Sequence, residues 1–517
     1  MNHGRACFHR LITTEKGNFM PTQRQNASDI LVLAILLGLL ADLLVRDASW
    51  GINIVVWTWT FLCVIFVLHR RMGMLMRKGD WFVLWLIIAC SALLTWRDSH
   101  VLCVLTFLAM VTLTGSLGVS VRKPGITNAS MLDYMNSLLA SALHSIAGSI
   151  FLFFNDLRPE AGSSDRPGKV APVLRGFALS IPLLFFFGSL FMAADAVFEQ
   201  TVRTIVDVDL TSALEHCLTI GFVTWIVAGF FRGRYIAKEV RLPENARPQS
   251  LALGKLETCI VLGAVDTLFL LFVLVQVRYL FGGADLVGIT PGLTYAEYAR
   301  RGFFELVTVA GLSLPLLLTI DWLHRREEAA ASPVIRLLMA LQVVLLLTIM
   351  ASATMRMGVY QSEYGLTELR LYVTAFMAWL TLVFFWFALT VLRGKRSRFA
   401  FGSFMAAVGT LFALYIVNPE DVIARTNISR ALEGKRFDAR YIASLRDDAT
   451  PAVIAALPSL SPEDRSIIAT ALLRSNASQE SPDWRSWNWS REKARRLLSA
   501  EERALKSMAG EKLHKEE

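Results

Sequence analysis

Charged residues are scarce in this chain. Asp, Glu, Lys and Arg make up 18% of its 517 residues, whereas hydrophobic residues make up 54%. Soluble globular domains carry roughly 25% charged residues. The shortage of charge therefore argues against a string of soluble domains and indicates a chain whose surface is largely in contact with lipid.

The sequence motifs of common enzymes are missing as well. The chain has no Walker-type Gly-rich loop, no H-E-x-x-H, no G-x-S-x-G and no Cys/His metal spacing. Its six cysteines contain no C-x-x-C pair and mostly lie in or beside apolar runs, as expected of small buried residues. We therefore expect no metal and no cofactor, and no enzymatic activity is indicated.

Nucleic acid is not an expected partner, although the net charge is +9. The excess Lys and Arg lie in loops between apolar runs. Basic residues beside membrane helices set the topology and attract anionic lipid. The expected partner is therefore the lipid bilayer.

What the chain does have is a series of long apolar runs. A bilayer core about 30 Å thick takes roughly 20 apolar residues per helix, and eleven runs approach or exceed that length. They predict an all-α, polytopic transmembrane bundle of about 11 helices. The runs cover residues 30–45, 50–68, 81–96, 101–121, 175–197, 213–231, 257–280, 302–322, 334–355, 369–392 and 399–417.

The first run is expected to act as an uncleaved membrane anchor. Mostly polar residues 1–29 precede it, and no short apolar region with an A-x-A cleavage site follows. Translation is expected to start at either Met1 or Met20.

Lys and Arg alternate between the loops on the two sides of this bundle. The N-terminal segment and the loops after every second run carry 25 of them, whereas the opposite loops carry six. Loops rich in Lys and Arg stay in the cytoplasm. The bias therefore predicts a multi-pass protein of the bacterial cytoplasmic (inner) membrane, with its N-terminus inside and its C-terminus outside.

One segment is ambiguous. Residues 131–155 place apolar side chains at helical spacing, but Asp133, Asn136 and His144 interrupt them. A crossing here would break the charge bias of every later loop. We therefore expect an amphipathic helix on the cytoplasmic surface, with a re-entrant segment as the alternative.

The predicted organisation has five parts. The tail holds 17 basic and 16 acidic residues, so it is no polybasic tether. Its Trp484, Trp487 and Trp489 are expected to pack within it, with contact to the membrane surface as the alternative. The parts are a cytoplasmic N-terminal segment (1–29), a four-helix transmembrane unit (30–121), a cytoplasmic linker with the amphipathic helix (122–174), a seven-helix main body (175–417) and a small helical, extracytoplasmic tail (418–517).

Charged residues and tyrosines gather on the predicted outer face. Arg301 and Glu305 are spaced i, i+4, a ladder that either marks a site or only stabilises the start of a helix. Arginine there suits a lipid phosphate or a carboxylate, which its guanidinium holds by two parallel hydrogen bonds. The candidate outer-face site comprises Asp195, Glu199, Arg278, Tyr298, Arg300, Arg301, Glu305, Glu363, Tyr364, Glu368, Arg370, Asn418 and Arg425.

A second candidate lies within the membrane. Asp266 is near the middle of run 257–280 and is the deepest acid in the chain. Ionisable groups are costly in a bilayer and usually face partners or water. Asp266 is therefore expected either to bind an ion or relay protons, or to pair with a polar group on a neighbouring helix.

Several of these stretches carry a family resemblance. Segments 298–306 (YARRGFFEL), 364–372 (YGLTELRLY), 418–427 (NPEDVIARTN) and 438–441 (DARY) resemble the bacterial membrane family known as domain of unknown function 4173. The resemblance covers roughly residues 175–450 and leaves out the first four helices and the far tail. It implies a multi-spanning bacterial membrane protein without an assigned activity.

Three functions are compatible with these features. The first is a non-enzymatic envelope protein, for binding or as a scaffold, whose outer-leaflet site and tail bind a lipid, an envelope component or a partner protein. The second is a transporter or flippase that uses Asp266 and Asp195. The third is a membrane-embedded transferase with Glu305 or Glu363 as base, which no nucleophile or metal set accompanies. No substrate and no oligomeric state is indicated.

Overall fold

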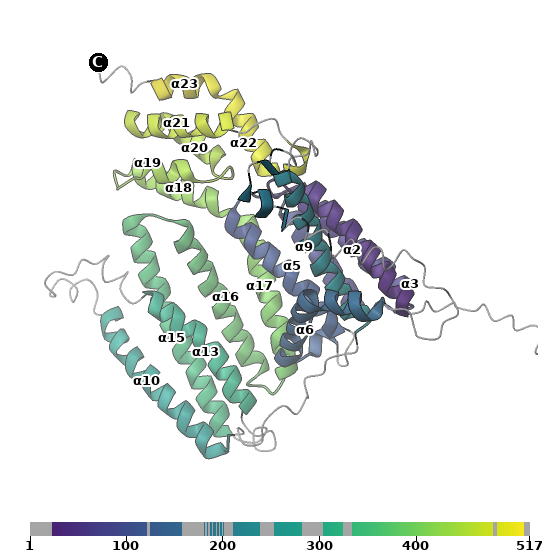
Figure 1. Cartoon of the computed structure of the whole chain (residues 1–517). Coiled ribbons are helices and arrows are strands. Elements are labelled where there is room, and N and C mark those ends of the chain that lie inside the picture. The colour runs from purple at the N-terminus through teal and green to yellow at the C-terminus, as the bar shows by residue number, and fades with distance from the viewer. Residues whose placement is uncertain are drawn as a thin grey trace, which may run out of the picture. The chain divides into compact units, whose positions relative to one another are not determined.

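In the computed structural model, the regular elements of the described parts of the chain are all helices (Figure 1). This confirms the predicted all-α class for these residues. They are residues 23–120, 125–157, 210–237, 253–281, 303–323, 333–478 and 483–510, with single positions between 180 and 200.

Ten of the described helices are long and apolar enough to cross a membrane. Their most apolar windows are only 22–50% buried, and Leu268, Leu271 and Leu274 are 60–63% exposed. So much exposed apolar surface is stable in lipid and not in water. The chain is therefore a multi-pass membrane protein. The ten are Gln23–Val45, Ile52–Arg71, His100–Gly118, Met131–Asp156, Ser212–Tyr235, Lys255–Gln276, Phe303–Leu323, Pro333–Tyr364, Glu368–Thr390 and Arg396–Val417.

The predicted runs and these ten helices differ at three places. Run 81–96 forms most of helix α4, Lys78–Leu93, whose 16 residues make it shorter than any of the ten. Run 175–197 lies largely outside the described residues. The additional helix is α6, Met131–Phe151, which a π-helical turn extends to Asp156. By length and composition it qualifies as a crossing, so its placement on the cytoplasmic surface stays a prediction.

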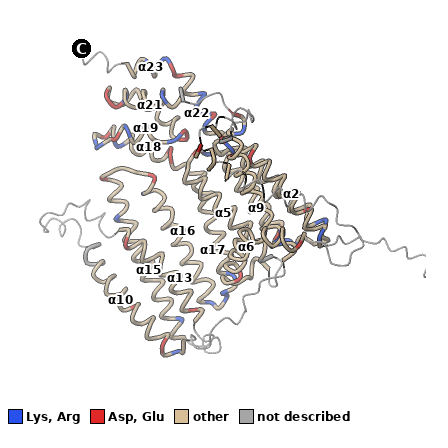
Figure 2. The backbone as a smooth tube through the Cα atoms, viewed as in Figure 1, with Lys and Arg blue, Asp and Glu red and all other residues tan. Residues whose placement is uncertain are grey.

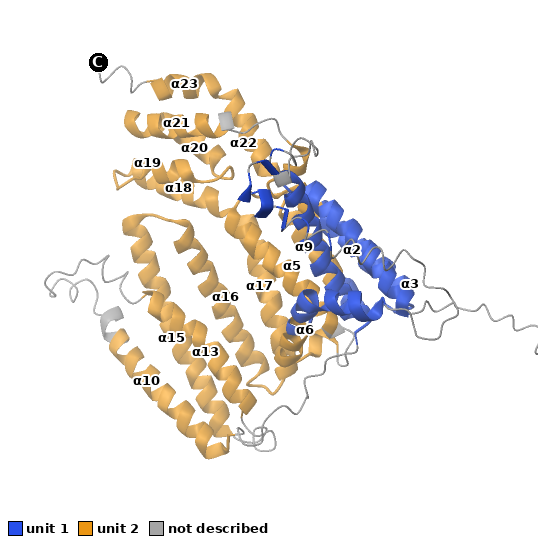
Figure 3. Cartoon of the chain, in the orientation of Figure 1, with its two compact units in different colours: residues 1–47, 56–81, 139–240 blue, residues 48–55, 82–138, 241–517 orange. Residues whose placement is uncertain are grey.

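The chain divides into two compact units (Figure 3), of which unit 1 comprises residues 1–47, 56–81 and 139–240. Here helix α2, Gln23–Val45, packs along helix α9, Leu210–Tyr235. A Cβ on Gly38 would lie only 2.3 Å from Oγ1 of Thr224. Small residues let membrane helices approach this closely, and the approach maximises their van der Waals contact.

Unit 2 comprises residues 48–55, 82–138 and 241–517. In its core α15 contacts α10, α13 and α16, and Leu346, Phe384 and Phe387 are fully buried. Figure 2 shows that charge in these helices is concentrated near their ends, as a hydrocarbon environment requires. The membrane helices are α5 (His100–Ser120), α10 (Lys255–Phe281), α13 (Phe303–Leu323), α15 (Pro333–Tyr364), α16 (Glu368–Thr390) and α17 (Phe399–Val417).

The C-terminal part of unit 2 is a compact set of short helices with its own apolar core. Ile442, Ile468 and Leu498 are at most 2% exposed in this core. The set lies at one end of α15, α16 and α17 (Figure 1). Its helices are α18 (Pro419–Leu432), α19 (Ala439–Ser444), α20 (Thr450–Ala456), α21 (Pro462–Ser478), α22 (Trp489–Ala500) and α23 (Glu502–Gly510).

Candidate functional site

The predicted outer-face site is described only in part. The backbone of Arg278 lies in α10, but its side chain is outside the described part. Asp195 belongs to unit 1, where its Oδ1 accepts hydrogen bonds from the backbone N–H groups of Val197 (2.7 Å) and Phe198 (3.1 Å). Glu305 is exposed on the first turn of α13. The members that lie outside the described residues are Glu199, Tyr298, Arg300 and Arg301.

The other predicted residues meet where the C-terminal helices contact the ends of the membrane helices of unit 2. We call this region the tail junction. It is formed by residues 94–100, 361–372, 418–448 and 483–491. It unites two stretches singled out by sequence, 364–372 and 418–427.

The turn between α15 and α16 is held by one asparagine of the tail. Nδ2 of Asn427 donates to the carbonyl of Leu366 (2.7 Å), and its Oδ1 accepts from the N–H of Leu366 (2.9 Å). The amide therefore pairs with this backbone as a neighbouring strand would. Gly365 adopts a φ of +77°, which favours glycine, and a Cβ there would lie 2.4 Å from Oδ1 of Asn427.

Replacing Gly365 by alanine is expected to break this contact. The new Cβ is disfavoured at positive φ and clashes with Asn427, so we expect a loss of about 1–3 kcal/mol of stability. Thermal unfolding of the purified protein in detergent measures it. Gly394 is the matched control, because it is also at positive φ (+74°) but has open space around it. The stability lost in Gly394→Ala therefore reports the backbone strain without a clash.

Arg430 closes the C-terminal end of α15. Its guanidinium donates to the backbone carbonyls of Gln361 (3.4 Å), Ser362 and Glu363 (2.8 Å), and the residue is 6% exposed. The last carbonyls of a helix have no partner within the helix, and a cation there also opposes the helix dipole. In the predicted site, Glu363 thus takes part through its backbone, while its side chain is exposed.

Glu368 faces a second carboxyl group across the tail junction. Glu420 of α18 is 1% exposed and hydrogen-bonds to Glu368, whose N–H donates to the hydroxyl of Tyr441 (3.0 Å). Burial, together with the neighbouring carboxylate, raises the pKa of Glu420 to about 8. The pair therefore holds a proton at neutral pH.

Asp98, in the loop before α5, holds two arginines of the tail. Its Oδ1 lies 2.8 Å from Nε of Arg491, and its Oδ2 lies 3.3 Å from Nη1 of Arg446. Arg491 also donates to the backbone carbonyls of Trp50 (2.6 Å) and Ser486 (2.7 Å). One carboxylate, 7% exposed at its side chain, thus ties the tail to the membrane helices.

Asp448 makes the reciprocal contact from the tail. Its Oδ2 accepts from the N–H of Asp98 (2.6 Å), and its Oδ1 lies 3.3 Å from Nη1 of Arg97 and accepts from the Ser490 hydroxyl. Burial raises the pKa of Asp448, and it raises the pKa of the neighbouring Asp447 to about 7. The tail junction is therefore a network of carboxyl groups and arginines largely withdrawn from water.

The tryptophan segment docks through its backbone. The N–H of Trp489 donates to the carbonyl of Thr95 (2.8 Å), and the carbonyl of Trp487 accepts from Ile52 (3.0 Å). The side chains of Trp484, Trp487 and Trp489 are 63%, 42% and 57% exposed. The expectation that these rings pack within the tail is therefore wrong, because the backbone is held by the helix-end loops and all three side chains stay exposed.

Arg370 borders a small cavity at the ends of α13, α15 and α16. Its guanidinium lies 4.2 Å from the ring centre of Tyr360, and its Nη1 donates to the carbonyls of Tyr364 (3.2 Å) and Gly365. Its Nε and Nη2 make no hydrogen bond to the described residues. The cavity holds 170 Å³ and is lined by Phe303, Phe304, Met357, Tyr360, Thr367, Leu369 and Arg370.

Two further predicted residues have local roles. Asn418 sits at φ +58°, between α17 and α18, and its Oδ1 has no hydrogen-bond partner among the described residues. Arg425 is two-thirds exposed and pairs with Asp421 (2.7 Å), one turn earlier. Arg425 thus points to solvent, and among the described residues its ion pair is with its own helix and not across the tail junction.

Asp266 is 3% exposed in the middle of α10, and neither carboxylate oxygen has a partner among the described residues. Gln342 of α15 is fully buried and equally unpartnered. Gln276 accepts a hydrogen bond from Ser352 (3.4 Å), ten residues further along both helices. The helices run parallel in this register, so Asp266 and Gln342 lie at the same depth.

The predicted site did not include Asp98, Arg446 and Asp448, and it did not include Glu420, although Glu420 belongs to the stretch 418–427 that the sequence singled out. No spacing rule connects them, since 348 residues separate Asp98 from Arg446. For Asp98 and Glu420 the available signal was a charged residue shortly after an apolar run, where solvation alone explains a charge. Only contact with the tail distinguishes them.

The family comparison covers most of the described chain. Residues 81–456 match the model described as Domain of unknown function (DUF4153). The match confirms that the family is an uncharacterised one, but it does not confirm the resemblance to domain of unknown function 4173. The matched segment also begins at residue 81, within the first four predicted helices, which the resemblance had left out. No curated protein and no solved structure matches the chain. Because the matched segment spans well over half of its length, the chain belongs to the DUF4153 family.

Proposed function

We propose that this membrane protein binds an anionic amphiphile, a lipid with a phosphate headgroup, at the Arg370 cavity. The carrying observation is a guanidinium whose Nε and Nη2 donate to no described residue, beside an aromatic and alkyl cavity at the ends of three membrane helices. Arg370 binds the phosphate oxygens, and Phe304 and Met357 contact the apolar part of the ligand.

The size of the cavity limits what enters it. Its 170 Å³ is below the roughly 300–1,000 Å³ of sites that enclose a drug-sized ligand. The cavity therefore takes one phosphate group or the end of one chain, while the rest of the lipid stays in the bilayer. This arrangement is that of a binding or scaffold protein, and we infer no chemical step.

The proposed setting follows from the charge bias. The N-terminus lies in the cytoplasm of a bacterium, the tail lies outside the inner membrane, and the Arg370 cavity opens toward the outer leaflet. Exposed Trp484, Trp487 and Trp489 support a position of the tail at the membrane surface, because indole rings favour the headgroup level of a bilayer.

Lipid titration of the purified protein tests the site. We expect phosphatidylglycerol to bind in detergent, as counted by native mass spectrometry, and Arg370→Ala to raise its Kd about tenfold, since one charge-assisted pair contributes roughly 1.5–3 kcal/mol. Leu369→Trp, which obstructs the exposed mouth of the cavity and keeps the charge, is expected to weaken binding as well.

Arg398→Ala is the matched control. Arg398 is an exposed arginine beyond the opposite end of α16, so its loss is expected to leave the affinity unchanged. Equal effects of Arg370→Ala and Arg398→Ala would contradict a defined site and indicate general attraction of lipid to positive charge.

A transporter is the second candidate function, favoured by Asp266 and Gln342. Two polar side chains that have no partner among the described residues, at one depth of two packed helices, are costly in a bilayer, and a bound ion or proton offsets that cost. Flux through proteoliposomes that is abolished by Asp266→Asn supports this function. Absence of flux in the wild type counts against it.

A further inference from the structure

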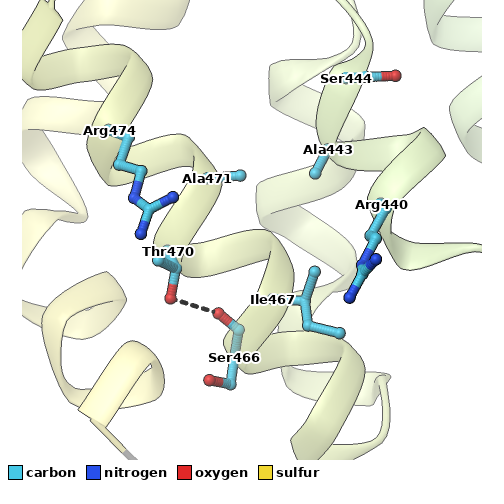
Figure 4. A pocket seen from close by; sticks show the side chains of 8 residues that line it. All are labelled: Arg440, Ala443, Ser444, Ser466, Ile467, Thr470, Ala471 and Arg474. Atoms are coloured by element: carbon cyan, nitrogen blue, oxygen red, sulfur yellow. Dashed lines mark hydrogen bonds between the residues drawn. The ribbon is translucent and has the colours of Figure 1, made fainter.

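The tail carries a groove that the lipid site does not involve. It lies between α19 and α21, holds 590 Å³, and is lined by Arg440, Ala443, Ser444, Ser466, Ile467, Thr470, Ala471 and Arg474 (Figure 4). Both helices are anchored in the apolar core of the tail through Ile442 and Ile468. The walls of the groove are therefore fixed by packing and do not depend on a ligand.

Two arginines flank this groove from opposite helices. Arg440 projects from α19 and Arg474 from α21 (Figure 4). Both are exposed, and neither forms an ion pair or hydrogen bond with any residue in the described ranges. Most other arginines of the tail, such as Arg430, Arg446 and Arg491, are engaged. The groove thus presents the guanidinium groups of Arg440 and Arg474, each with several N–H donors, to an anionic ligand.

Each hydroxyl group that lines the groove already donates a hydrogen bond to a backbone carbonyl. Ser444 donates to the carbonyl of Tyr441 (2.7 Å), Thr470 to that of Ser466 (2.7 Å) and Ser466 to that of Ala509 (3.3 Å). Their oxygens remain able to accept hydrogen bonds. A ligand that uses them must therefore bring its own N–H or O–H donors.

The remaining lining is alkyl. Ala443, Ile467 and Ala471 provide a floor without polar atoms in their side chains, on which an apolar side chain is removed from water. A phosphate polymer has neither donors for the hydroxyl oxygens nor apolar groups for this floor. A peptide with acidic and apolar side chains has all three kinds of group.

We propose that this groove binds an acidic, apolar-containing segment of a partner protein. Two carboxylates of the segment pair with Arg440 and Arg474, its backbone N–H groups donate to Ser444 and Thr470, and an apolar side chain rests on Ile467. The tail is then a protein-docking module, held at the membrane by the tail junction.

A peptide selection tests this assignment. The probe is a random twelve-residue peptide library displayed on phage, selected against the full-length protein in detergent. We expect the enriched peptides to combine Asp or Glu with Leu, Ile or Phe. For one of them, made synthetically, we expect Arg440→Ala together with Arg474→Ala to raise the Kd at least tenfold by fluorescence anisotropy, and Ala471→Trp, which fills the groove with both charges intact, to do the same.

Arg436→Ala serves as the matched control. Arg436 is an exposed arginine that precedes α19 and does not line the groove, so we expect no change in Kd. Enrichment of peptides that bind the double variant equally well would overturn the proposal. So would binding of inorganic polyphosphate that depends on Arg440 and Arg474 while no acidic peptide is enriched.

Discussion

Replacing Asp98 by alanine is expected to release the tail from the membrane helices. The change removes the carboxylate that pairs with both Arg446 and Arg491. Breaking a buried pair costs about 3–5 kcal/mol. Because Arg446 is 35% exposed and Arg491 is 21% exposed, we expect the lower end, about 3 kcal/mol.

Limited proteolysis in detergent measures this release. Cleavage beyond residue 418 is expected to be much faster in the Asp98→Ala protein, and its tail to unfold at lower temperature. Asp421→Ala provides the comparison, because the partner of Asp421 is Arg425, whose side chain is 66% exposed, and such a pair contributes at most about 1 kcal/mol. Wild-type resistance of the Asp98→Ala protein would show that Asp98 does not hold the tail.

The stability of the tail junction is expected to fall as the pH rises from 5.5 to 8.5. The pKa of Glu420 is about 8 in the folded protein, whereas a glutamic acid in an unfolded chain titrates near 4.3. Between these values the folded state binds more protons than the unfolded state, so each rise in pH favours unfolding. Asp447, with its pKa raised to about 7, acts in the same direction up to that pH.

Thermal unfolding at a series of pH values tests this dependence. We expect the free energy of unfolding to fall by on the order of 2 kcal/mol between pH 5.5 and 8.5. Each pKa unit corresponds to about 1.4 kcal/mol, and Glu420 shares its proton with Glu368. Glu420→Gln keeps the hydrogen-bonding shape without the charge and is expected to flatten the profile. Glu463→Gln, at an exposed position of α21, is expected to leave it unchanged. An unaltered slope in Glu420→Gln would assign the pH dependence to other groups.

These two predictions share one physical origin. The tail is fastened by charged and polar groups, with Arg430 on the end of α15, Asn427 on Leu366, and Asp98 between Arg446 and Arg491. Water competes weakly for groups that are this far buried, so each contact depends on the presence of the others.

The membrane class of the fold was open to prediction because it depends on local properties. An apolar run of adequate length is stable as a helix in lipid whatever its neighbours are, so runs such as 257–280 and 302–322 correspond to α10 and α13. Segment 131–155 was harder, since Asp133 and His144 lower its hydrophobicity without shortening it. Its 26-residue helical stretch, Met131–Asp156, is apolar enough for a span.

The sequence predicted only those parts of the site whose residues lie close together in the chain. Tyr364, Glu368 and Arg370 were found because they crowd one short turn, and Arg370 does border a cavity there. Arg425 belongs to an equally polar stretch but pairs with Asp421 in solvent. Residue type and spacing cannot separate these two cases, because the difference is whether another helix covers the side chain.

By itself, then, the sequence determined that this protein is a multi-pass helical membrane protein with a polar C-terminal tail, because the free energy of placing a helix in lipid is a sum over its own residues. The tertiary structure decided that the tail is fastened to the helix ends and which charges do it. Asp98 meets Arg491, 393 residues away, and such a pairing arises only when distant segments fold together and exclude water from the charges between them.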